Sequence, residues 1–259
     1  MIPEINFQVP TPEKVAEFVY SLKESLGETV EDAEENYENQ EACIFIPLSK
    51  ELVRRIIMSK ELTDELREEI SEIIRPLLNK EKEELDKTLI KIKELWAKIN
   101  KSYWKEIEKY FPGLIEESYD AYLTNIVCGA YFDGNEVTIP KYKSVNESLF
   151  VYVMAEELLH LAYWKFWEEL CGKRKEEFMW NSGIEGWNSW NISEAIPEYL
   201  LINNPTFKKY GWDKFKRTNS YPWLDKIRPL LDPLWKNKKS FKEFVIKSHK
   251  VLGIRIDPR

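Results

Sequence analysis

The first part of the chain carries its apolar residues at helical spacing. Between Leu77 and Asn100 they recur every three or four positions, at Leu85, Leu89, Ile92, Trp96 and Ile99. Such a stripe lies on one face of a helix and packs against other elements. Local signals predict further helices from Pro12 to about Leu26, from Lys50 to about Ser59, from Thr63 to Arg75 before Pro76, and from Ser102 to Tyr110. The pattern therefore predicts a helical N-terminal region over residues 1–113, with Pro112-Gly113 as the candidate boundary.

Two runs after this boundary are rich in β-branched and aromatic residues. Tyr122–Phe132 and Glu136–Tyr142 are predicted to be strands, and Asp133-Gly134-Asn135 between them is typical of a hairpin turn. A small sheet, antiparallel or mixed, is therefore expected before the next helix. Residues 114–259 form the second predicted region, and the predicted fold class is α+β, mainly α.

The segment from Val151 to Trp167 is apolar almost all round and contains neither Gly nor Pro. This composition is typical of a buried helix. Ser144–Glu147 has the sequence of a capping box that would begin the helix, and Cys171-Gly172 would end it.

Three polar residues lie close together near the middle of this apolar helix. Glu156 and His160 are four residues apart and share a face, so they are placed to bind one ion together. Glu157 is rotated by about 100° and lies beside that face. Carboxylates in a buried helix cost several kcal/mol unless they are paired, protonated or bound to metal. The cluster is therefore a candidate functional site.

A second polar segment, Ser193–Tyr199, follows a loop rich in Trp and Gly. That loop, residues 178–190, either lines a cleft or packs its aromatic rings beneath the surface. Asn191 is the expected cap of the next helix, which would place Pro197 in the first turn and Glu194 near the helix start. Without a metal, Glu194 would serve as the capping-box partner of Asn191.

Taken in order, these features resemble the zincin metallopeptidases. The sequence EELLH at Glu156–His160 is similar to the zinc-binding motif HExxH, with Glu156 in place of the first His. The sequence SEAIPEY at Ser193–Tyr199 resembles the segment that supplies the third metal ligand in the gluzincin branch, although two of its residues depart from the usual ones. The resemblance covers about Tyr119–Leu201, roughly a third of the chain.

The resemblance implies a role for each residue of the cluster. Glu156, His160 and Glu194 would bind a divalent metal ion, with zinc as the expected ion, and Glu157 would be the general base. Carboxylate oxygen binds zinc, so a Glu/His/Glu site is chemically possible, with more negative charge and a preference for harder ions.

Stabilisation of the oxyanion is the remaining role that the resemblance implies. In gluzincins a Tyr or His from a later part of the chain hydrogen-bonds the oxyanion. The candidates in this sequence are Tyr199, Tyr210, Tyr221 and His249.

Three functions remain open. The favoured one is a metal-dependent hydrolase, specifically a peptidase, that acts on a peptide or protein. The second is a catalytically inactive zincin-like pseudopeptidase that binds a peptide or protein. In the third, purely structural alternative, Glu157 and His160 form a buried ion pair and Glu194 caps a helix.

Composition and charge limit the classes of partner and the cellular compartment that we expect for this protein. The net charge of −7, without a basic block, argues against nucleic acid. Three widely spaced Cys without a CxxC motif indicate reduced thiols, and neither a signal peptide nor an apolar run of about 18 residues is visible. We therefore expect a cytoplasmic protein without a membrane partner. The high content of Lys and Glu, with two Gln, resembles thermophilic proteins.

Overall fold

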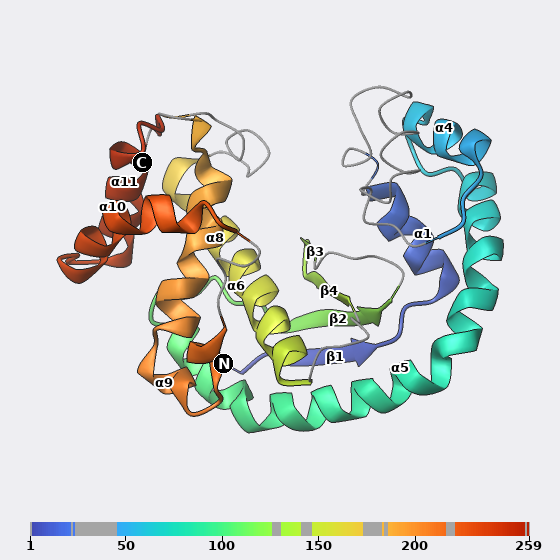
Figure 1. Cartoon of the computed structure of the whole chain (residues 1–259), viewed down its shortest axis with the longest axis horizontal. Coiled ribbons are helices and arrows are strands. Elements are labelled where there is room, and N and C mark those ends of the chain that lie inside the picture. Colours follow the sequence, from blue (N-terminus) through green and yellow to red (C-terminus); the bar gives the residue numbers. More distant parts are fainter. Residues whose placement is uncertain are drawn as a thin grey trace. The chain divides into compact units, whose positions relative to one another are not determined.

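The computed structural model divides the chain into two compact units. The sheet unit comprises Glu4–Lys98 and Ser118–Met154, and the helical unit comprises Met1–Pro3, Ile99–Glu117 and Ala155–Arg259. The structure describes residues 2–21, 23, 46–125, 131–140, 147–172, 183, 186–215, 221–256 and 258. This part of the chain is mainly helical with a four-stranded mixed sheet (Figure 1). The predicted α+β, mainly α, class is therefore confirmed, and a zincin-like fold stays a prediction. The predicted boundary at Pro112-Gly113 stays a prediction.

The sheet has the strand order β1-β2-β4-β3. Its strands are β1 (Glu4–Gln8), β2 (Ser118–Thr124), β3 (Tyr131–Asp133) and β4 (Glu136–Pro140). β1 and β4 both run parallel to β2, and β3 runs antiparallel to β4. The sheet is therefore mixed. β1 was not predicted, because its five residues lie far along the chain from the strand that pairs with it.

The predicted hairpin is present, but the first predicted strand is divided. Asp133 pairs with Glu136 across the turn, and Gly134 adopts a φ of 52°, which favours glycine. The run Tyr122–Phe132 was predicted to be one strand. In the structure β2 ends at Thr124 and β3 begins at Tyr131, so the apolar run supplies parts of two strands.

Among the described residues, three helices belong wholly or mainly to the sheet unit. They are α1 (Pro12–Ser21), α4 (Lys50–Met58) and α5 (Asp64–Ile107). Ser49 caps α4 as expected, because its side chain accepts a hydrogen bond from the Leu52 amide. The predicted end of the first helix, at about Leu26, lies outside the described residues.

α5 corrects the prediction of three separate helices between Thr63 and Tyr110. It is one continuous helix of 44 residues with Pro76 inside it. Proline removes one amide donor and leaves the carbonyl of Glu72, four residues earlier, without its helical bond. Both Glu72 and Pro76 are exposed, so water can hydrate that carbonyl and the helix continues.

The helical unit contains most of α6 and the later helices of the described residues. They are α6 (Glu147–Cys171), α8 (Ser189–Pro197), the π-helix η2 (Glu198–Ile202), α9 (Pro205–Lys208), the 3₁₀ helix η3 (Trp212–Lys214), α10 (Leu224–Lys236) and α11 (Phe241–Val251). Large buried rings fill the core between them, including Trp104, Trp167, Trp212, Phe207 and Phe244. The predicted capping box of α6 lies outside the described residues. Ser240 caps α11, because its side chain accepts a hydrogen bond from the Glu243 amide.

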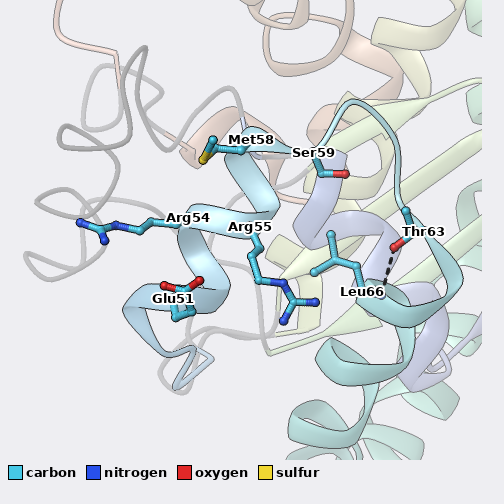
Figure 2. A pocket seen from close by; sticks show the side chains of 7 residues that line it. All are labelled: Glu51, Arg54, Arg55, Met58, Ser59, Thr63 and Leu66. Carbon is cyan, nitrogen blue, oxygen red and sulfur yellow. Dashed lines mark hydrogen bonds between the residues drawn. The ribbon is translucent and has the colours of Figure 1, made fainter.

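A pocket of about 520 Å³ lies in the sheet unit, between α4 and the beginning of α5 (Figure 2). Two of its lining side chains are Arg54 and Arg55, and Arg55 is paired with Glu69 at 2.5 Å. None of the candidate site residues lines this pocket.

Among the described residues, no helix combines the length and the apolar character that a membrane span requires. Cys171 is buried, and the other two cysteines lie outside the described residues.

Candidate metal centre

α6 buries all three polar residues of the motif. The exposed fractions are 8% for Glu156, 8% for Glu157 and 2% for His160, in a helix whose other neighbouring side chains are apolar. Tyr103 fixes the helix here by donating a hydrogen bond to the Ala155 carbonyl at 2.7 Å. The sequence therefore places two carboxyl groups and an imidazole in a core, where each needs a compensating partner.

Glu194 comes from α8, and the start of this helix corrects the prediction. Asn188, not Asn191, is the cap: the side chain of each asparagine accepts a hydrogen bond from the backbone amide of the other at 3.0 Å. α8 therefore begins at Ser189, before the predicted start. Glu194 lies inside the helix with its side chain in the core, so it is not the capping residue that the structural alternative requires.

The position of Pro197 was also predicted wrongly. It is the last residue of α8 rather than a first-turn residue, and the π-helix η2 follows it directly. A proline cannot donate the next helical hydrogen bond, and the change to wider i→i+5 bonding lets the chain continue. In proteins generally, such π-turns occur frequently at functional sites.

The two helices bring three ligand groups together. One ligand atom each from Glu156, His160 and Glu194 lies within 4.8 Å of the others, and all three residues are buried. His160 Nε2 is 3.4 Å from Glu194 Oε1. In a tetrahedral zinc site with bonds of about 2.1 Å, two ligand atoms lie about 3.4 Å apart. The residues present therefore fit a divalent ion, after a small approach of the more distant atoms.

Burial changes the acidity of the carboxyl groups. It raises the pKa of Glu194 to about 8, against the opposing effect of a hydrogen bond from Tyr221. Burial also raises the pKa of Glu157 well above its usual range, and the nearby negative charge of Glu194 adds to the increase. Protons or a cation must therefore balance the carboxylates at neutral pH.

Tyr221, one of the candidates for stabilising the oxyanion, contacts the triad through Glu194. Its hydroxyl donates a hydrogen bond to the carboxylate of Glu194. Sequence reasoning named Tyr221 only as one of several possible oxyanion partners. No spacing or motif links it to Glu194, because the contact depends on how the segment before α10 packs in the helical unit.

Tyr199 and His249 have other hydrogen-bond partners. The Tyr199 hydroxyl donates to Asp232 Oδ1 at 2.9 Å. His249 is fully buried, with Nδ1 2.8 Å from the Val245 carbonyl oxygen and Nε2 3.2 Å from Ser189 Oγ. Burial lowers the pKa of His249 to about 4, so its ring is neutral at pH 7. Their roles at an oxyanion stay predictions.

His160 Nε2 contacts Glu194 Oε1, whereas the structural alternative paired His160 with Glu157. That alternative therefore loses both its proposed pair and its proposed cap.

Comparisons with protein-family models, with curated proteins and with solved structures find no match for the chain. The case for a metal centre rests on the convergence and burial of the three side chains.

Proposed function

We propose that the chain is a metal-dependent hydrolase that cleaves peptide bonds. The observation that carries the proposal is the convergence of Glu156, His160 and Glu194, from two helices, within a buried space that an ion can fill. Three buried polar groups at this separation are costly without a bound cation or protons, and they form a donor set that zinc accepts.

The ion would supply Lewis-acid chemistry, polarising a substrate carbonyl and acidifying a water molecule. The chain itself would hold that ion through two carboxylates and an imidazole. Zinc is the proposed ion, although two carboxylates also suit harder divalent ions.

Glu157 is the proposed general base. It follows Glu156 directly on α6, and its pKa is raised well above the usual range. A carboxylate with a raised pKa is a stronger base. Glu157 would accept a proton from water and deliver it to the leaving amine.

A non-catalytic metal-binding protein is the second candidate. Glu156 stands where zincins have a histidine, so two carboxylates would cancel the charge of a divalent ion. A neutral site acidifies water less than a cationic one. Such a protein would keep the ion and bind a peptide without cleaving it.

Matched variants test the proposal. We expect the purified protein to contain about one equivalent of divalent metal, and Glu194→Gln and His160→Ala to lose it. Glu198→Gln is the control, because Glu198 is a buried glutamate one turn further along that instead pairs with Arg228 at 2.7 Å. Glu157→Gln should keep the metal and lose peptide hydrolysis. Metal content that is unchanged in Glu194→Gln would refute the site, and metal without turnover would favour the non-catalytic candidate.

A further inference from the structure

Four aromatic side chains of the helical unit form a group that we name the aromatic cluster. Trp187 directly precedes the Asn188 cap of α8, and Trp190 lies in the first turn of that helix. Tyr221 and Trp223 come from the segment before α10. The Trp223 ring centroid lies 6.0 Å from each of the other two indoles and 5.6 Å from Tyr221. Tyr221 and Trp190 are 5.8 Å apart. The four rings are therefore one continuous contact group.

The aromatic cluster differs from the core aromatics in its exposure. All four of its members are partly exposed, whereas Trp104, Trp167 and Trp212 are at most 1% exposed. Large aromatic rings that keep contact with solvent as a group are typical of binding surfaces.

Tyr221 connects the cluster to the candidate metal centre. Its ring packs against Trp190 and Trp223, and its hydroxyl donates to Glu194. Tyr221 alone therefore separates the triad from the indole rings of Trp190 and Trp223, so a ligand bound at the triad would lie close to them.

The charges of the two sites indicate what kind of group this surface accepts. A divalent ion bound by the carboxylates of Glu156 and Glu194 would leave no net charge, and the cluster consists of uncharged rings. The chain as a whole carries a net charge of −7. An acidic side chain would gain no compensating charge there, whereas an uncharged ring would gain contact area.

We propose that the aromatic cluster is the recognition site for an aromatic or large apolar side chain of the peptide substrate, next to the bond held at the metal centre. This inference rests on the proposed metal site. It adds the substrate class that the catalytic residues alone do not specify.

Binding of three chelating probes to the zinc-loaded full chain tests the proposal. The probes are the N-acetyl hydroxamates of phenylalanine, alanine and glutamate, which share a metal-binding group and differ in the side chain. We expect the phenylalanine probe to bind at least about tenfold more tightly than the alanine probe, which is the effect of burying one large apolar side chain. The glutamate probe should bind most weakly. Calorimetry gives the dissociation constants without requiring turnover.

Tryptophan variants locate the preference. Trp223→Leu and Trp190→Leu should reduce the phenylalanine-to-alanine ratio to within about threefold. Trp235→Leu is the control, because Trp235 is also partly exposed but packs on Tyr199 and Phe244, outside the cluster. As a check that needs no variant, the phenylalanine probe should change tryptophan emission of the wild type more than the alanine probe does.

The outcomes separate the two proposals. A chain that binds no zinc overturns the proposed function and this inference together. Zinc-loaded protein that binds the phenylalanine and alanine probes equally overturns the inference alone. The inference also fails if both cluster variants keep the preference, or if Trp235→Leu loses it as well.

Discussion

Tyr221 and Tyr199 each donate a hydrogen bond to a carboxylate, so Tyr199 is a matched control for the effect of Tyr221 on metal binding. Tyr221 donates to Glu194 of the triad, and Tyr199 donates to Asp232 at 2.9 Å. Groups that hydrogen-bond a metal ligand orient it, and their loss commonly lowers metal affinity by about 10–100-fold. We expect Tyr221→Phe to weaken zinc binding by roughly this factor in a chelator competition. Tyr199→Phe should change stability but not zinc affinity. Equal zinc affinities for the two variants would contradict the prediction.

Arg228 and Glu198 form a second residue-scale contact that can be separated from the metal centre. Arg228 Nε and Nη2 donate to the two carboxylate oxygens of Glu198 at 2.9 and 2.7 Å. Arg228→Met would leave a mostly buried carboxylate without its partner, and we expect a loss of about 2 kcal/mol in the free energy of unfolding. The double variant with Glu198→Gln should recover part of this loss, because the stranded charge is gone. Urea denaturation of the two single variants and the double variant measures the coupling, and strictly additive losses would argue against the pair.

Elements differ in how far their sequences predict them. Ser49 and Ser240 are local caps, and α4 and α11 begin directly after them, so their starts depend on local sequence alone. Pro76 and Pro197 misled the prediction, because whether a proline ends a helix depends on the hydration or rearrangement of the carbonyls before it. β1 could not be found by pattern, since its pairing with β2 is set by the tertiary fold.

The candidate site shows the same division between local and tertiary information. Helical periodicity places Glu156 and His160 on one face, so their spacing of four residues is enough to predict that they lie together. Bringing Glu194 to them requires the packing of α8 against α6, which was expected only from a resemblance. The contact of Tyr221 with Glu194 could not be predicted, because nothing in the spacing of the chain relates the two residues.

At the scale of elements, His249 joins α11 to the start of the helix that carries Glu194. Its Nε2 accepts a hydrogen bond from Ser189, and its ring stacks on Trp167 of α6 at 4.5 Å. Burial lowers the pKa of His249 from 6.5 to about 4 in the folded chain. Between these values the unfolded chain binds a proton that the folded chain does not, so stability is lost as the pH falls from about 6.5 to about 4.

A variant without the titrating ring tests this pH dependence. His249→Gln should be less stable than the wild type at pH 7, and the difference should shrink as the pH falls through this window. Urea midpoints of both proteins, measured in the presence of a chelator from pH 4 to pH 7.5, would show the convergence. Parallel profiles would mean that His249 titrates alike in the folded and unfolded chains.

At the scale of the whole molecule, the candidate metal centre lies within one of the two units. Glu156, His160 and Glu194 all belong to the helical unit, whereas β1, β2, β3 and β4 belong to the sheet unit. A ligand that binds only the folded state suppresses the opening of the structure that contains its site. Zinc should therefore slow amide hydrogen exchange most strongly in residues 155–171 of α6 and in α8 and η2. Protection of the strands against local opening should change little.

Hydrogen exchange followed by mass spectrometry, with zinc and with a chelator, measures this distribution. His160→Ala is the matched control, because it removes one ligand and should abolish the difference between the two conditions. Zinc-dependent protection that persists in this variant would mean that the ion binds elsewhere on an acidic chain. Protection spread equally over the strands and over α6 and α8 would instead mean that the ion stabilises both units together. Selective protection of α6 and α8 is the result expected from an ion bound between them, because Glu156 and His160 lie on α6 and Glu194 lies on α8.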